Sequence, residues 1–144
     1  MKQYSKEEKE LRMKKNPKKT LRTKADKLFQ QAGIKKWGEE CYCCGSVSGK
    51  IQIHHFVPKG ISSFLRYNLL NGIPLCMGCH FSHHHKGDPA IHEKMKEKMG
   101  LIRFNTLIEL AKEQHSSITT IKWYRNHIKE LEKYLNNGII NIEK

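Results

Sequence analysis

Apolar residues recur with a helical period in three segments of the chain, and these segments predict the outer parts of the fold. In residues 20–32 the apolar side chains share one helical face, and Gly33 can end the helix. These side chains are Leu21, Ala25, Leu28, Phe29 and Ala32. A second helix is predicted from Pro89 to Gly100, because Asp88 can cap it and proline suits a first turn. Its predicted buried stripe is Ile91, Met95 and Met99.

The third helical segment covers residues 117–135, where apolar positions are spaced alternately by three and four residues. They are Ile121, Tyr124, Ile128, Leu131 and Leu135, and the pattern ends at Asn137 and Gly138. This spacing fits packing of the helix on the rest of the domain. It also fits a homodimer paired through the C-terminal helices, but two heptads are too few to define a coiled coil.

Residues 41–88 follow a different pattern, since helical periodicity is absent until about residue 80. The stretch KIQIHHFV alternates Ile51 and Ile53 as a strand does, and NGIPLC predicts a turn followed by a second short strand. The sequence therefore predicts an α+β fold in three parts. A basic arm with one helix covers residues 1–40, a core covers 41–88, and C-terminal helices cover 89–144.

Length and hydropathy limit what this chain can build. With 144 residues it is long enough for one domain with appendages, and 38% hydrophobic residues leave only a small core. Mean hydropathy is −0.69, and no apolar run approaches the length of a membrane span or a signal peptide. We expect a soluble cytoplasmic protein with no membrane partner.

The charge of the chain indicates a polyanionic partner. Lys and Arg number 27 against 14 Asp and Glu, for a formal net charge of +13, and DNA is the partner we expect. Residues 1–27 hold eleven of these basic residues against four acidic ones. The candidate DNA contacts are Lys14, Lys15, Lys18, Lys19 and Arg22 in the arm, and Arg66 in the loop SSFLRYN. The alternative is a solvated, lysine-rich surface, with Arg66 merely solvating its loop.

The cysteines form two pairs with the spacing of metal ligands. Cys41 and Cys44 make one C-x-x-C pair, Cys76 and Cys79 make the other, and 31 residues separate the pairs. Four thiolates suit a tetrahedral, closed and therefore structural zinc site. The alternative is a set of free thiols in the core. Cys43 does not fit the spacing, and we expect it to be a free thiol.

The same region resembles the HNH endonucleases. Their hallmark is present as NGIPLCMGCHFSHHH, in which Asn71 precedes a Pro-Leu-Cys-x-x-Cys-His element and His84 follows His80 by four residues. HHFVP supplies the adjacent histidines His54 and His55 upstream. The match covers residues 41–84, and the region is also similar to phage recombination proteins of the NinG type.

The resemblance implies a fold and a role for each matching residue. It implies a treble-clef-like ββα-metal core that holds one catalytic divalent ion. His54, His80 and His84 would be the ligands of that ion. His55 would be the general base, and Asn71 would orient this base or touch the metal.

Elementary chemistry agrees with these roles in part. Neutral imidazole accepts a proton near neutral pH, a divalent ion stabilises charge on phosphate, and His80 and His84 share one helical face. Because an imidazole replaces the Asp that many HNH members carry at position 54, Zn²⁺, Ni²⁺ or Mn²⁺ fits better than a strict Mg²⁺ requirement. One feature conflicts with a shared site, since adjacent residues of an ideal strand point to opposite faces. A strand that ends or bulges near Pro58 would remove the conflict.

The sequence thus predicts an HNH-type, metal-dependent DNA endonuclease that works in a bacterial or phage-infected host cell. A related alternative is a phage recombination nuclease acting on branched or single-stranded DNA. An alternative from another class is a non-catalytic zinc module that only binds nucleic acid, although such a module has no use for a base beside a metal ligand.

Overall fold

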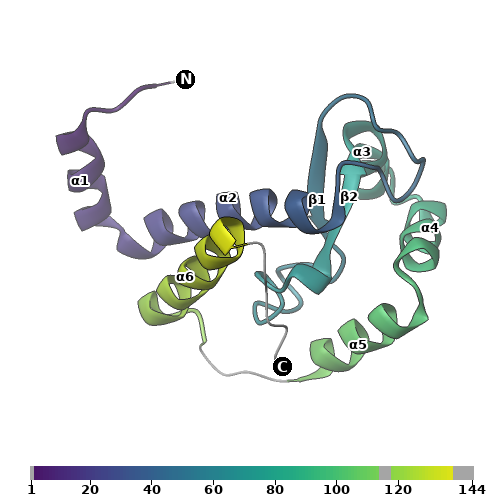
Figure 1. Ribbon diagram of the computed structural model, residues 1–144. Helices are drawn as coiled ribbons and strands as arrows, with labels where there is room; N and C mark the ends of the chain where they lie inside the picture. Colours follow the sequence, from purple (N-terminus) through teal and green to yellow (C-terminus); the bar gives the residue numbers. More distant parts are fainter. Residues whose placement is uncertain (1, 114–117, 138–144) are drawn as a thin grey trace.

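The computed structural model describes residues 2–113 and 118–137 (Figure 1). Within these residues the chain is α+β, with six α-helices, one 3-10 helix and a two-stranded antiparallel sheet. In chain order the elements are α1 (Lys6–Lys15), α2 (Pro17–Trp37), β1 (Ile51–His55), η1 (Leu69–Asn71), β2 (Gly72–Cys76), α3 (Met77–Lys86), α4 (Pro89–Met99), α5 (Leu101–Lys112) and α6 (Ile121–Asn137). None of the helices in the described ranges could cross a bilayer, because each is too short or too polar.

The basic arm is helical, and its helix α1 buries no residue. Asn16 separates α1 from α2 and caps the second helix, since its side chain accepts a hydrogen bond of 3.1 Å from the Lys19 N–H. The helix predicted at 20–32 is therefore present but begins earlier, at Pro17, and ends later, before Gly38 at φ 81°. Figure 1 shows α1 extending away from the other elements at the far end of α2.

One of the two cores joins α2 to α6, which are remote in the sequence. Phe29 and Ala32 of α2 are buried in the same cluster as Tyr124, Ile128 and Leu131 of α6. The apolar face that could have paired two chains thus packs on α2 of the same chain. The predicted start of this helix at residue 117 and its predicted end at Gly138 lie outside the described residues.

The second core lies between the sheet and the helices α4 and α5. β1 and β2 pair with Ile53 opposite Pro74, and Ile73 and Leu75 of β2 are fully buried. The helix predicted from Pro89 is confirmed, with the Asp88 cap, and its stripe of Ile91, Met95 and Met99 covers this core.

The helix α5 was not predicted. It begins directly after Gly100, and Leu107 is its only buried residue. Its first two residues, Leu101 and Ile102, are apolar but exposed, so they blur the period-3.6 pattern from which a helix is recognised.

Candidate functional site

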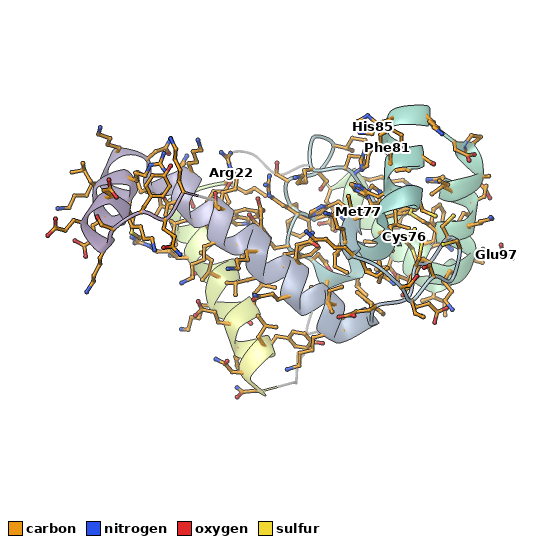
Figure 2. All side chains as sticks on the ribbon, turned by 90° about the horizontal axis from the view of Figure 1, so that it is seen from above. Arg22, Cys76, Met77, Phe81, His85 and Glu97 are labelled. Atoms are coloured by element: carbon orange, nitrogen blue, oxygen red, sulfur yellow. The ribbon has the colours of Figure 1, made fainter. Side chains whose placement is uncertain are left out.

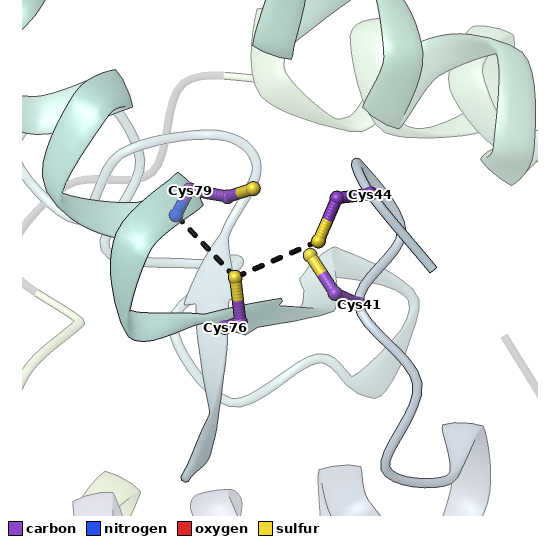
Figure 3. Close-up of side chains that lie close together, drawn as sticks. All are labelled: Cys41, Cys44, Cys76 and Cys79. Atoms are coloured by element: carbon purple, nitrogen blue, oxygen red, sulfur yellow. Dashed lines mark hydrogen bonds between the residues drawn. The ribbon is translucent and has the colours of Figure 1, made fainter. Parts of the chain in front are cut away.

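Four cysteines form a cluster whose sulfur atoms all lie within 4.8 Å of one another (Figure 3). Cys41 and Cys44 come from the loop after α2, Cys76 ends β2, and Cys79 lies in the first turn of α3. This arrangement could hold a metal ion. In a tetrahedral site with metal–sulfur bonds of about 2.3 Å, neighbouring sulfurs are about 3.8 Å apart. The sulfurs of Cys44 and Cys76 are separated by 3.8 Å.

Local backbone geometry explains why each pair can face one ion. Gly45 follows the first pair at φ 73°, where a side chain would be strained, and its N–H donates to the carbonyl of Cys41 at 2.9 Å. The N–H of Tyr42 donates to the carbonyl of Pro74 at 2.9 Å and joins this turn to the outer edge of β2. The Cys76 sulfur accepts a hydrogen bond of 3.4 Å from the Cys79 N–H at the start of α3.

The thiols differ in how readily they lose a proton. Burial raises the pKa of Cys41, but hydrogen bonds from the backbone of Cys44, Cys76 and Cys43 outweigh it and lower this pKa to about 7. Burial and the neighbouring sulfurs raise the pKa of Cys79. The thiolate form is therefore favoured at Cys41 and disfavoured at Cys79. Cys43 lies outside the four-sulfur group, although its side chain interacts with Cys79.

Three histidines form a second group that could hold a metal ion. One nitrogen of His54, one of His80 and one of His84 all lie within 4.8 Å of one another. Nδ1 of His54 and Nε2 of His84 are 3.1 Å apart. His54 comes from β1, while His80 and His84 lie one turn apart on α3, as the sequence spacing predicted.

The state of His54 suits a metal ligand. Burial, followed by the charges of His83 and His84, lowers the pKa of His54 to about 3, so the ring is neutral at pH 7. Metal ions bind the neutral ring. Among the described residues, Nε2 of His54 is the one buried side-chain nitrogen or oxygen that has no hydrogen-bond partner. Such an atom is commonly satisfied by an ordered water or an ion.

His55 is held on the opposite side of β1. Its ring stacks on Phe29 of α2, with 4.7 Å between ring centroids, and its Nε2 lies 2.8 Å from the carbonyl oxygen of Arg66. A carbonyl only accepts, so Nε2 carries the proton and Nδ1 is the unprotonated nitrogen of the neutral ring. Burial is the main cause that lowers the pKa of His55 to about 4, which keeps this ring neutral.

His54 and His55 both line one cleft of about 1160 Å³. α2 forms one wall, α3 contributes His80 and His84, and β1 with the loop at residues 58–60 completes the lining. His54 and His55 both belong to β1, and their rings point to opposite sides of the strand, toward α3 and toward α2. Both residues nevertheless line the same cleft.

Asn71 does not contact His55 or the histidine group. The residue is fully buried, and its Oδ1 accepts from the Val57 N–H at 2.7 Å. Its Nδ2 donates to the carbonyls of Val57 at 3.0 Å and Leu65 at 3.3 Å. The amide of Asn71 thus holds the loop that follows β1, and in the described residues no hydrogen bond joins it to His55 or to the histidine group, as a direct role in orienting the base or touching the metal would need.

The predicted DNA contacts separate into two kinds. Lys14, Lys15, Lys18, Lys19 and Arg22 are exposed on α1, α2 and the segment between them. Figure 2 shows Arg22 on α2 nearer to α1 than to His85 on α3. Arg66 is instead bound to the Asp26 carboxylate at 2.7 Å and is mostly buried, so it is not free for phosphate. The lysines that line the cleft are Lys27, Lys50 and Lys59, which the sequence did not single out because nothing local distinguishes them.

Comparisons of the chain with protein families, curated proteins and solved structures returned no match. The function of the site is therefore argued from its own geometry.

Proposed function

We propose that this chain is a metal-dependent DNA endonuclease of the HNH type, with one catalytic divalent ion held by His54, His80 and His84. The observation that carries the proposal is that one cleft is lined both by the three-histidine group and by His55. On one side of β1, three imidazoles converge within ligand distance. On the other side, His55 presents a single unprotonated nitrogen.

The residues of the chain supply the protein's part of phosphodiester hydrolysis. The bound ion would stabilise negative charge on the phosphate and on the leaving oxygen. Nδ1 of His55 accepts the proton of the attacking water, since Nε2 is already committed to the Arg66 carbonyl. The stacked ring of Phe29 and this hydrogen bond restrict the rotation of the base. A non-catalytic binding module would need neither restriction.

The four-cysteine group is proposed to bind a structural zinc ion. All four positions of a tetrahedral ion are filled by sulfur, so no position remains for water or substrate. The ion would connect the loop after α2 to the junction of β2 and α3. Since α3 carries His80 and His84, zinc would fix the helix that presents two of the three catalytic-metal ligands.

DNA is the proposed substrate because of the charge around the cleft. Three lysines and one acidic side chain line it, and that acid, Asp26, is neutralised by Arg66. Further exposed basic residues lie on α1 and on the first half of α2. Electrostatic attraction of this kind is independent of base sequence.

Plasmid cleavage tests the proposal directly. Purified full-length protein is incubated with supercoiled plasmid and with a branched DNA junction, in EDTA or with Mg²⁺, Mn²⁺, Ni²⁺ or Zn²⁺. We expect nicked or linear product that requires a divalent ion and is abolished by EDTA. Preferential cutting of the junction would assign the chain to the recombination nucleases. DNA binding without cleavage in any of the four metals would contradict the proposal and favour a binding module.

A further inference from the structure

α2, which lies outside the HNH-like segment, contacts the catalytic hairpin with one continuous face. The residues involved are Asp26, Phe29, Gln30 and Gly33, whose spacing of three, four and seven places them together on a helix. Asp26 binds Arg66, and Phe29 stacks on His55. Gly33 allows α2 to approach β1 closely, since a Cβ at this position would lie 2.6 Å from Cγ1 of Ile53.

Gln30 makes the most specific of these contacts. Its Nε2 donates to the carbonyl of Ile53 at 2.8 Å, and its Oε1 accepts from the Ile53 N–H at 2.8 Å. One side-chain amide thus satisfies both backbone groups of one strand residue, as a neighbouring strand would do. Ile53 is the residue directly before His54.

The sheet explains why such a contact is needed. It has only two strands, and the backbone groups of the opposite residues Ile53 and Pro74 point away from the partner strand, as their bonds to Gln30 and Tyr42 show. A two-stranded sheet is marginally stable by itself, and its outer edges leave backbone groups unpaired. Tyr42 fills this need at the outer edge of β2, and Gln30 fills it at the outer edge of β1.

We propose that Gln30 is a positioning residue, whose amide fixes the backbone of β1 from which His54 and His55 project. The inference rests on the proposed function in treating this histidine pair as catalytic. The amide acts through Ile53, since its two hydrogen bonds both end on that residue. Loss of these two hydrogen bonds should therefore change the geometry of His54 and His55 without removing a metal ligand or the base.

The test compares the full-length, zinc-loaded protein with three variants. Gln30→Met keeps the length of the side chain but neither hydrogen bond. Gln30→Glu keeps the acceptor for the Ile53 N–H and loses the donor. Gln31→Ala is the matched control, because Gln31 is the next residue of α2 and lines the same cleft, but its side chain is exposed.

Three readouts are independent of cleavage: amide exchange at Ile53, the ¹⁵N imidazole spectrum of His55, and the affinity for added Ni²⁺. In Gln30→Met we expect exchange at Ile53 about tenfold faster, a mixture of His55 tautomers in place of the Nε2–H form, and Ni²⁺ affinity several-fold weaker. Gln30→Glu should fall between this variant and the wild type. Gln31→Ala should match the wild type in these three readouts. In cleavage assays kcat should fall in Gln30→Met while KM for DNA stays constant.

The outcomes separate this inference from the proposed function. Faster exchange at Ile53 with an unchanged His55 spectrum and unchanged Ni²⁺ affinity would make Gln30 merely structural and overturn the inference. Wild-type exchange at Ile53 in Gln30→Met would overturn it as well. If the His55 spectrum and Ni²⁺ affinity shift as expected but the wild type never cleaves DNA, the positioning role stands and the nuclease proposal fails.

Discussion

Two parallel hydrogen bonds join the guanidinium of Arg66 to the carboxylate of Asp26. Nε of Arg66 donates to Oδ1 at 3.0 Å, and Nη2 donates to Oδ2 at 2.7 Å. The hydroxyl of Tyr67 donates to the same Oδ1 at 2.8 Å. Because the carbonyl of Arg66 accepts from His55, this pair connects α2 to the proposed catalytic base. Arg66 therefore belongs to the support of the site and not to the DNA surface for which it was a candidate.

The Asp26–Arg66 pair predicts a pH-dependent contribution to stability. Burial raises the pKa of Asp26, but the hydrogen bonds from Arg66 and Tyr67 outweigh it and lower this pKa below 3.8. The stabilisation is thus present above about pH 4 and is lost as pH falls through the folded-state pKa. Asp26→Asn should lower the free energy of unfolding at pH 7 by about 1 kcal/mol, the scale of a partly exposed pair.

Urea denaturation from pH 7 to pH 3 measures this difference. The gap between the wild type and Asp26→Asn should shrink below pH 4, and loss of metal ligands in acid affects both proteins alike. Glu132→Gln is the control, because its carboxylate forms a pair of 3.0 Å with Lys24 in which both side chains are well exposed. A gap that stayed constant down to pH 3 would contradict the prediction.

The cysteine cluster predicts one tightly bound zinc ion per chain. Such sites contribute about 10–16 kcal/mol of apparent binding free energy, which is also folding free energy. Cys76→Ser should therefore give unfolded or insoluble protein, whereas Cys43→Ser should fold and keep its zinc. Elemental analysis of both variants and the wild type makes the comparison. Folded wild-type protein without zinc would remove this assignment.

Replacement of His54 and replacement of His55 should impair DNA cleavage in different ways. His55→Ala removes the base and no ligand, so the protein should bind Ni²⁺ and DNA normally but cleave about 10²–10⁴-fold more slowly. His54→Ala removes a ligand, so Ni²⁺ should bind more weakly, and excess metal should restore part of the rate. A metal titration of the cleavage rate separates the two effects.

His85→Ala is the control for this comparison. The ring of His85 contacts Phe81 on α3 and lies outside the three-histidine group. Its replacement should change neither Ni²⁺ affinity nor cleavage. If His55→Ala cleaves at the wild-type rate while His54→Ala is inactive at every metal concentration, the two roles are reversed.

Helix α1 and the residues before it should contribute to DNA affinity and not to folding. α1 buries no residue, and Asn16 caps α2, so a chain that starts at Asn16 keeps the rest of the fold. Residues 1–15 contain six Lys and Arg. Their removal should weaken DNA binding and reduce the slope of log K against log salt by up to about 5. Fluorescence anisotropy at several salt concentrations measures both quantities, with zinc content and Tm as controls. An unchanged slope would make the arm a solvated tail.

The sequence by itself determined the features that depend on local spacing. The C-x-x-C pairs predicted the four-sulfur group, and the four-residue interval between His80 and His84 predicted two ligands on one helical face. Asp88, Pro89 and Gly100 likewise located α4, because caps and first-turn residues act within a few positions of the helix end.

Only the tertiary structure decided the contacts between distant segments. The spacing along α6 allowed either a second chain or the same chain as partner, and in the structure this face packs on α2 of the same chain. Asn71 and Arg66 each had two local interpretations, and their partners Val57 and Asp26 lie 14 and 40 residues away. Whether His54 and His55 could share a cleft depended on how α2 and α3 pack beside β1. Burial and hydrogen bonds between distant segments determine which partner each of these side chains contacts, and local sequence spacing does not contain that information.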